Sequence, residues 1–284
     1  MSLKIVSADE RMQNGNGIKG VIFGGSKIGK TSLLWTLDAA TTLFVDMEAG
    51  GLSVRDWKGD SVEVTDWQTA KNLACWLGGP DMARAGTMED YSDAHYAHVC
   101  QTYGDPAILA KYKTIFIDSI TVLGRLCFGW CKRQPQAFSE KTGKPDTRGA
   151  YGLHGQEMIG ILTRFQRAKG KSVWLVGLLD EKTDDYGRKT FQPQIDGSKT
   201  GLELPGIVDQ VITMAALPDK DGVQQRQFVC SNPNDFGFPA GDRSGALNTI
   251  EPAHLGKLMD KILAGMATSP ATNLTYTNPI TTEE

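Results

Sequence analysis

The chain has 284 residues, of which 40% are hydrophobic and 22% are charged, so it can bury a sizeable core and is not globally disordered. Its formal net charge of −3 excludes a protein that is basic as a whole, and any nucleic-acid contact must come from a local patch. Five irregularly spaced cysteines argue against a disulfide framework. Because no apolar stretch approaches the ~20 residues of a membrane span and no signal-peptide core is present, we expect a cytoplasmic protein without membrane contact.

A glycine-rich loop follows the first apolar segment of the chain. Residues 1–17 form a polar segment, and a buried strand is predicted over about 18–23. The apolar stretch 31–37 predicts a helix. Strand, loop and helix in this order are the context of the phosphate-binding pattern G-x-x-x-x-G-K-[ST], which here reads Gly24-Gly25-Ser26-Lys27-Ile28-Gly29-Lys30-Thr31.

Each residue type in this loop suits a phosphate. Glycines let backbone N–H groups curl around the anion without a clash from Cβ. Lys30 would neutralise charge on the β- and γ-phosphates, and the hydroxyl of Thr31 would bind Mg²⁺. The predicted nucleotide-binding residues are therefore the whole loop and Ser32, and the predicted cofactors are ATP and Mg²⁺.

Two later strands end in acidic residues. Residues 42–48 form a short apolar run that ends in Asp46 and Glu48. If this strand lies beside the first one in a parallel sheet, Glu48 reaches the γ-phosphate and can orient or deprotonate a water molecule; the alternative is an ordinary acidic strand end. Residues 113–119 form a second such strand, and its Asp118 is predicted to hold Mg²⁺ together with Thr31.

The middle of the chain offers weaker signals. Asp66 is placed to cap a helix over 67–77. His95, His98 and Cys100 resemble a fragment of a metal site, but no second ligand pair has zinc-site spacing, so a helical surface segment is favoured. Cys127 and Cys131 share one face of a helix predicted over about 120–133 and are expected to pack in the core.

The region 134–150 is predicted to be a loop that is locally basic. With the preceding helix end it carries Lys132, Arg133, Lys141, Lys144 and Arg148 against Glu140 and Asp146. Two interpretations stay open, a solvated loop and a contact to a nucleic-acid backbone. Tyr151 is the nearest aromatic residue, and no aromatic pair stands out as a stacking platform.

The second half of the chain predicts further alternation of strands and helices. We expect a helix over about 154–168, a buried strand over 172–179, a polar hairpin turn at 185–188 and a flexible loop at 197–201. A strand within 207–216 should pair with 223–231 in an antiparallel hairpin, and a last helix should cover 252–264. The fold class is thus α/β, a mostly parallel twisted sheet flanked by helices with an antiparallel hairpin extension. The predicted domain is 18–265, followed by a disordered tail, 266–284.

The order of these motifs resembles the RecA-like core of P-loop ATPases, and within it the phage nucleotide-binding proteins related to RecA. The resemblance covers about residues 18–264. It rests on the glycine loop and on four further stretches: 44–48, Asp118-Ser119, Asp146-Thr147-Arg148 before Tyr151-Gly152, and Leu204-Pro205-Gly206-Ile207-Val208-Asp209.

The resemblance implies roles for matching residues. Glu48 would be the water-activating glutamate, and loops 134–150 and 181–200 would contact single-stranded DNA. The stretch around Arg243 is similar to one that reaches the γ-phosphate of a neighbouring subunit, although Gly241 replaces its usual lysine; Lys199 is a second candidate. A homo-oligomer with nucleotide at the subunit interface follows. The chain departs from the family at Leu178-Leu179, where RecA-like cores have a polar sensor.

The resemblance therefore implies a Mg²⁺-dependent ATPase that acts on single-stranded DNA in phage recombination or annealing, in the cytoplasm of a bacterial host. The missing sensor implies slow or partner-dependent hydrolysis. An alternative is an ATP-binding regulatory or assembly module without DNA contact, which the mixed charge of 181–200 favours. A small-molecule kinase is disfavoured, because no lid with clustered arginines is found.

Overall fold

A computed structural model provides the structure of the protein. It describes residues 17–183, 187, 189–219 and 221–268, together with Ile5 and Ser7. Most of the polar segment 1–17, the predicted turn at 185–188 except Gly187, and residues 269–284 of the predicted tail lie outside the described residues.

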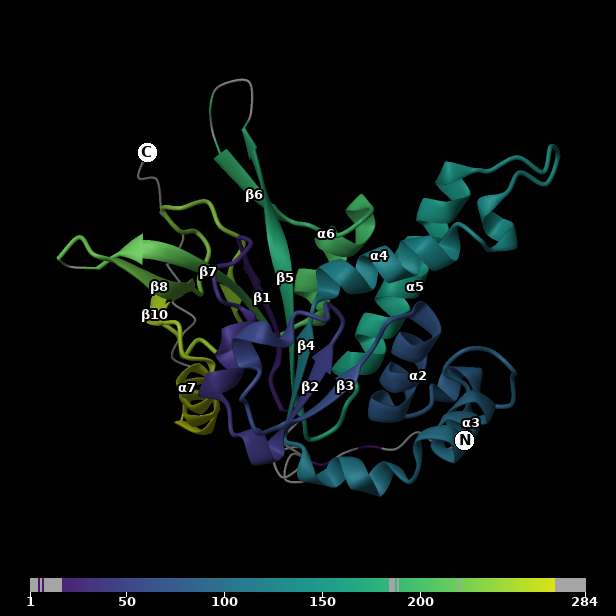
Figure 1. The fold of residues 1–284 in the computed structure, drawn as a ribbon, viewed down its shortest axis with the longest axis horizontal. Helices are drawn as coiled ribbons and strands as arrows, with labels where there is room; N and C mark the ends of the chain where they lie inside the picture. Colours follow the sequence, from purple (N-terminus) through teal and green to yellow (C-terminus); the bar gives the residue numbers. More distant parts are fainter. Residues whose placement is uncertain are drawn as a thin grey trace, which may run out of the picture.

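One sheet of ten strands organises the described part of the chain (Figure 1). Eight strands follow the order β10-β8-β7-β1-β5-β4-β2-β3, while β6 pairs with β5 and β9 pairs with β7. The strands are β1 Lys19–Gly24, β2 Thr42–Asp46, β3 Asp60–Glu63, β4 Thr114–Asp118, β5 Ser172–Thr183, β6 Lys189–Pro193, β7 Gln210–Pro218, β8 Gln224–Val229, β9 Gly241–Asp242 and β10 Ile250–Pro252.

The six strands from β7 to β3 run parallel, and β6, β8, β9 and β10 are antiparallel additions. This confirms the predicted α/β class, including the antiparallel hairpin β7–β8. The α-helices are α2 Trp67–Gly78, α3 Asp93–Tyr103, α4 Ile120–Cys131, α5 Thr147–Gln166, α6 Ser198–Ile207 and α7 Leu255–Thr268. Short 3₁₀ helices occupy Thr31–Thr36, Ala39–Thr41, Gly51–Val54, Met82–Arg84, Pro106–Lys111 and Pro135–Ala137.

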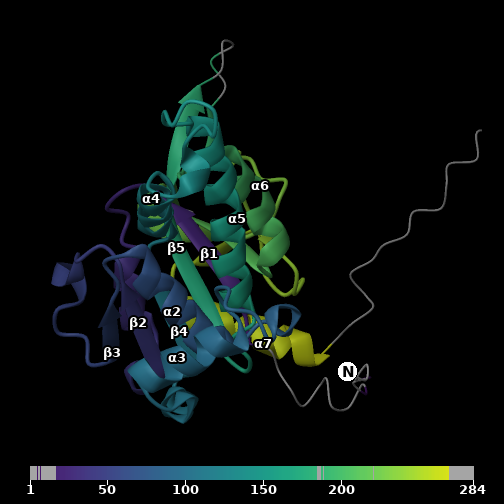
Figure 2. The same cartoon turned by 90° about the vertical axis from the view of Figure 1, so that its right-hand side faces the viewer.

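Helices cover both faces of the sheet (Figure 2). Alternation along β1 sends Val21 and Phe23 into one core with α2, α4 and α5, and sends Ile22 into a second core with α7 and the 3₁₀ helix Thr31–Thr36. The same alternation in β4 places Ile117 in the first core and Phe116 in the second. Burial on both faces explains why these strands read as near-continuous apolar runs.

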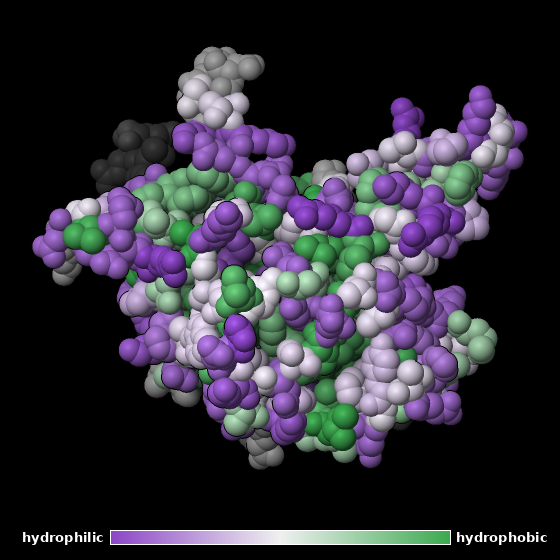
Figure 3. All heavy atoms as spheres, viewed as in Figure 1, coloured by the Kyte–Doolittle hydropathy of each residue, from purple (hydrophilic) through white to green (hydrophobic). Residues whose placement is uncertain are grey.

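Two projections extend beyond the body of the sheet (Figure 1). The arm comprises residues 128–151, the end of α4, the connection and the start of α5. The hairpin comprises the outer halves of β5 and β6, in which Leu179 pairs with Pro193 and Thr183 with Lys189. Both are mainly hydrophilic in the space-filling view (Figure 3).

Several predicted boundaries are wrong. α5 begins at Thr147, capped by Asp146, so helix replaces the last part of the predicted loop 134–150. The expected loop 197–201 starts helix α6, which tolerates Pro205 in its interior. The segment after the glycine loop is a 3₁₀ helix, Thr31–Thr36, rather than an α-helix. The last helix runs to Thr268, three residues into the expected tail.

Candidate nucleotide site

The glycine loop lies at the carboxyl end of β1, between β5 and β7. It bends through two residues with left-handed backbone, Lys27 at φ 62° and Gly29 at φ 101°. A side chain at Gly24 would meet the carbonyl oxygen of Met214 at 2.7 Å, whereas nothing lies within 4 Å of a Cβ built on Gly25. The loop is thus tightly packed where it leaves β1 and open at its outer turn, as a phosphate cradle requires.

Lys30 folds back over this loop. Its ammonium donates hydrogen bonds to the carbonyl oxygens of Gly24 at 3.0 Å and Gly25 at 2.9 Å, and the residue is 9% exposed. Burial lowers the pKa of Lys30, while the nearby carboxylates of Asp118 and Glu48 act in the opposite direction. A phosphate would give this buried cation an anionic partner in place of two neutral carbonyls.

Thr31 and Asp118 meet across the sheet edge. The Thr31 hydroxyl donates to Oδ2 of Asp118 at 2.6 Å. Asp118 is 4% exposed, and burial raises the pKa of its carboxyl to about 6, although the hydrogen bond from Thr31 works against this rise. The two residues that the sequence predicts for Mg²⁺ therefore place two oxygen atoms side by side.

The oxygen atoms of Thr31 and Asp118 fit a magnesium ion. Mg²⁺ prefers oxygen ligands, keeps several waters and commonly takes only one or two protein ligands together with phosphate oxygens. Within the described ranges, no group of three or more His, Cys, Asp or Glu side chains could hold a metal without such help. In particular, both ring nitrogens of His95 are occupied, by the Tyr91 N–H at 2.8 Å and by Asn72 at 3.0 Å.

Glu48 reaches the same edge by a route that differs from the prediction. β2 is not beside β1, because β5 and β4 lie between them. β2 ends at Asp46, whose carboxylate accepts the N–H groups of Glu48 and Ala49, both at 3.0 Å, and so forms a turn. This turn holds the Glu48 carboxylate where it accepts the Ser119 hydroxyl at 2.5 Å.

Ser119 links this carboxylate to a helix. It follows Asp118 directly, is 1% exposed, and its Oγ accepts the N–H of Val122 at 3.3 Å as the N-cap of α4. The structure therefore brings together Lys30, Thr31, Asp118 and Glu48, four of the predicted site residues, with Ser119 as an additional contact.

Arg243 lies at the opposite end of the sheet from these residues. It follows β9, which pairs Asp242 with Gln210 at the start of β7, whereas Gly24 of the loop pairs with Met214. Four strand residues separate the two levels, about 13 Å. The Arg243 guanidinium donates to the carbonyl of Gly206 at 3.0 Å.

Lys199, the second candidate for contact with a neighbouring nucleotide, is in the first turn of α6. Trp57 packs edge-on against Phe44 beside the second core and has a structural role there.

Sequence reasoning missed an arginine beside the loop. A Cβ on Gly29 would lie 2.8 Å from Nη1 of Arg226, an exposed residue of β8. Nothing local marks Arg226, since it is nearly 200 positions from the loop. The only available signal is the predicted antiparallel pairing, which returns this strand to the carboxyl edge of the sheet.

Sequence reasoning also missed an aromatic pair on the arm. Phe128 of α4 and Tyr151 of α5 stack with centroids 4.5 Å apart and an interplanar angle of 21°. Tyr151 is 43% exposed, and the Lys132 ammonium lies 5.0 Å from the Phe128 ring centroid. The two residues are far apart in sequence but adjacent across two antiparallel helices.

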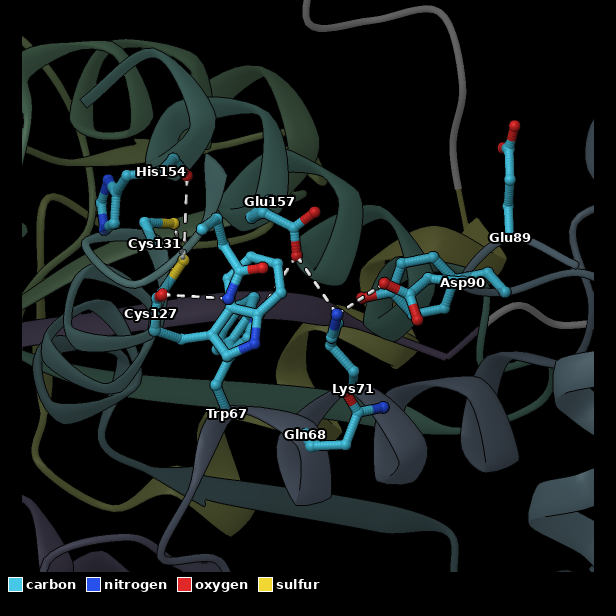
Figure 4. Close-up of polar contacts among 12 residues, drawn as sticks. Trp67, Gln68, Lys71, Glu89, Asp90, Cys127, Cys131, His154 and Glu157 are labelled. Carbon is cyan, nitrogen blue, oxygen red and sulfur yellow. Dashed lines mark hydrogen bonds and ion pairs between the residues drawn. The ribbon is translucent and has the colours of Figure 1, made fainter. Parts of the chain in front are cut away.

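A buried ion-pair cluster lies below the arm (Figure 4). Lys71 of α2, with its side chain 2% exposed, contacts Asp90 at 2.5 Å and Glu157 of α5 at 3.6 Å. Its ammonium also lies 4.3 Å from the Trp130 ring centroid of α4, and Trp67 donates to Glu157 at 3.1 Å. Cys127 and Cys131 are buried nearby as free thiols, which agrees with the predicted packing role.

The sheet, the loop and the acids at its carboxyl edge define a P-loop nucleoside triphosphatase fold. The sequence matches the family model described as an AAA domain over residues 16–244, and the chain belongs to that family of nucleotide-binding ATPase domains. No curated protein matches the sequence.

Among solved structures, the chain is similar to one described as a prototypical ATPase from the type III secretion system of pathogenic bacteria. The identity is 14% and the TM-score 0.34. The match covers 72% of this chain and 54% of the other, so the chain spans about half the length of that structure. Within the described residues, no helix is long and apolar enough to cross a bilayer.

Proposed function

We propose that the chain is a Mg²⁺-dependent ATPase that binds single-stranded DNA and couples nucleotide hydrolysis to strand annealing or recombination. The observation that carries the ATPase part is the convergence of Lys30, the Thr31–Asp118 pair and Glu48 at one sheet edge. When bound, Mg²⁺ would neutralise charge that develops on the transferred phosphoryl group.

The residues of this edge have separate tasks in the proposal. Lys30 exchanges its two loop carbonyls for phosphate oxygens, and Thr31 and Asp118 hold the metal. Glu48 orients the attacking water and accepts its proton. Ser119 is a positioning residue, because its hydroxyl fixes one carboxylate oxygen of Glu48 and leaves the other free.

The DNA part is supported by the two projections. The arm and the hairpin stand on the carboxyl side of the sheet, the side of the nucleotide loop (Figure 1). The arm carries the exposed cations Lys132, Arg133, Lys141, Lys144 and Arg148. The stacked Phe128–Tyr151 pair lies beside Lys132, and the exposed Tyr151 ring offers an aromatic face to a base.

A homo-oligomer belongs to the proposal because Arg243 cannot serve its own nucleotide from the far end of the sheet. In an assembly, Arg243 or Lys199 of one subunit would approach the nucleotide of the next. The resemblance to phage proteins related to RecA supports a place in phage recombination inside the bacterial host cytoplasm.

The test is ATP hydrolysis with and without single-stranded DNA at low and high salt. We expect stimulation by DNA that fades with salt, because phosphate contacts release counterions. Replacing Lys132, Lys141 and Lys144 by Gln should reduce DNA binding and its salt dependence. A matched control replaces three exposed lysines elsewhere, Lys58, Lys169 and Lys257, with the same change in net charge.

Hydrolysis that ignores DNA in every variant would reject the DNA role and favour the nucleotide-controlled assembly module. The ion pair between Lys189 and Glu181 at 2.6 Å, which reduces the free positive charge of the hairpin, would fit that outcome. If the chain binds ATP but does not hydrolyse it, the proposed ATPase activity is rejected and the proposed nucleotide binding remains.

A further inference from the structure

We infer that Arg226 binds the nucleotide at its nucleoside end, where the α-phosphate and the base leave the loop. The inference rests on the proposed nucleotide-binding function and adds a residue that neither the loop pattern nor the resemblance assigns. It follows from the strand order, from the face on which Arg226 lies, and from its contact with Gly29.

The direction of β8 places Arg226 at the carboxyl edge of the sheet, where the glycine loop lies. β8 runs antiparallel to β7, so its beginning lies at the carboxyl ends of the parallel strands. Arg226 pairs with Ala216, two positions beyond Met214, which pairs with Gly24 at the end of β1. The arginine therefore projects just past the level at which the loop begins.

Side-chain alternation sets the face. Phe228, two residues after Arg226, is fully buried in the second core with Leu33 and Leu34 of the 3₁₀ helix that follows the loop. Residues i and i+2 of a strand share one face, so Arg226 lies on the face of this helix but beyond the core. Its Nη1, Cζ and Nε atoms are 2.8, 3.2 and 3.6 Å from a Cβ position on Gly29.

The loop separates two sides of the site. On one side of β1 lie β5, β4 and β2, and Asp118 at the end of β4 and Glu48 just after β2 define where the γ-phosphate binds. On the other side, β7 and β8 carry Arg226. A triphosphate whose middle phosphate sits in the loop near Lys30 and whose γ-phosphate faces the acids must direct its α-phosphate and nucleoside toward β8.

Arginine suits this position. Its planar guanidinium donates two parallel hydrogen bonds to a phosphate and stacks on an aromatic base. Gly29, with φ of 101°, has the backbone conformation that favours glycine, and its lack of a Cβ leaves room for the guanidinium beside the loop. Because the contact is at the nucleoside end, it should act on ATP and ADP alike and leave the chemical step unchanged.

The test is Arg226→Gln, with ATP and ADP dissociation constants and steady-state hydrolysis measured on the full chain. We expect both dissociation constants and KM to rise by the same factor, about 10- to 100-fold, the range for a lost charge-assisted hydrogen bond. The kcat value should stay within about twofold of the parent. Arg226→Lys should recover part of the affinity.

A matched control is Gln225→Ala, on the opposite face of the same strand. A fall in kcat with unchanged ADP affinity would overturn the inference, because it would place Arg226 at the γ-phosphate. Unchanged affinities for both nucleotides would overturn it too. If the parent and Lys30→Ala bind nucleotide equally poorly, the proposed function itself fails, and the inference falls with it.

Discussion

The buried lysine below the arm offers a direct test of what holds α2, α4 and α5 together. Lys71→Met removes the charge and keeps most of the length of the side chain. Glu157, with its side chain 21% exposed, then keeps the Trp67 N–H as its one donor among the described residues, and Asp90, 36% exposed, loses its 2.5 Å partner. We expect this variant to be less stable than the parent.

The size of the effect follows from exposure. Removing one partner from a fully buried ion pair costs about 3–5 kcal/mol, because the other charge stays in a poor solvent. Here both carboxylates reach water in part, and the loss should fall to about 2–3 kcal/mol. Adding Glu157→Gln to Lys71→Met should recover about half of it, because the remaining buried charge disappears while the amide oxygen still accepts from Trp67.

The assay is urea unfolding followed by circular dichroism, with the midpoints compared at a common slope. Lys111→Met is the matched control. Lys111 contacts Asp60 at a similar 2.6 Å, but both side chains are more than half exposed. Exposed pairs add little to stability, so this variant should unfold close to the parent. If Lys71→Met unfolds at the same midpoint as Lys111→Met, burial does not strengthen the cluster and the reasoning is wrong.

Four further predictions concern the site and its sheet. Lys30→Ala should abolish ATP binding in calorimetry but leave the thermal midpoint unchanged or higher, because a buried cation with a lowered pKa is removed. Glu48→Gln should keep ATP affinity and lose about 10²- to 10⁴-fold in hydrolysis rate; equal turnover would place the base elsewhere. Ser119→Ala should lower kcat about tenfold with little change in KM, and should cost ~1 kcal/mol of stability through the lost cap of α4. Burial lowers the pKa of Lys19 from 10.5 to about 8, so the unfolded chain binds more protons between these values and stability should rise with pH across the window. Lys19→Met should remove that rise, which is ~2.4 kcal/mol between pH 7.5 and pH 10, in urea unfolding at these two pH values.

The residues next to each motif were enough to predict the position of the glycine loop and of the acidic residues near it. The glycine pattern and Asp118 each sit at the end of an apolar strand, and such ends meet at one edge of a parallel sheet whatever the strand order. Glu48 reaches that edge although the expected adjacency of β1 and β2 is wrong. Its position depends on the turn around Asp46, which a strand pattern does not reveal.

The remaining features depend on contacts between distant segments. α5 starts seven residues before its expected start, because Asp146 caps a first turn whose Gly149 packs against the carbonyl of Gln136. α6 contains Pro205, which local propensity treats as a helix breaker, and is held by packing of Leu204 in the first core. Arg226 can be recognised as a residue of the site only once the position of β8 in the sheet is known.

Helix α4 gives the shortest covalent path between the candidate site and the arm. Its N-cap is Ser119, whose hydroxyl binds Glu48, and its first turn carries Thr121, whose hydroxyl accepts the N–H of Leu178 at 3.0 Å. The eight residues from Ile120 to Cys127 then span about 12 Å to the start of the arm at Phe128. Leu178 of β5 thus contacts α4 at the position where a RecA-like core would place a polar sensor, and a shift of α4 would reach Glu48 through Ser119 without such a sensor. Stimulation of hydrolysis by DNA would then depend on the rigidity of this helix, which the Lys71 cluster supports from below.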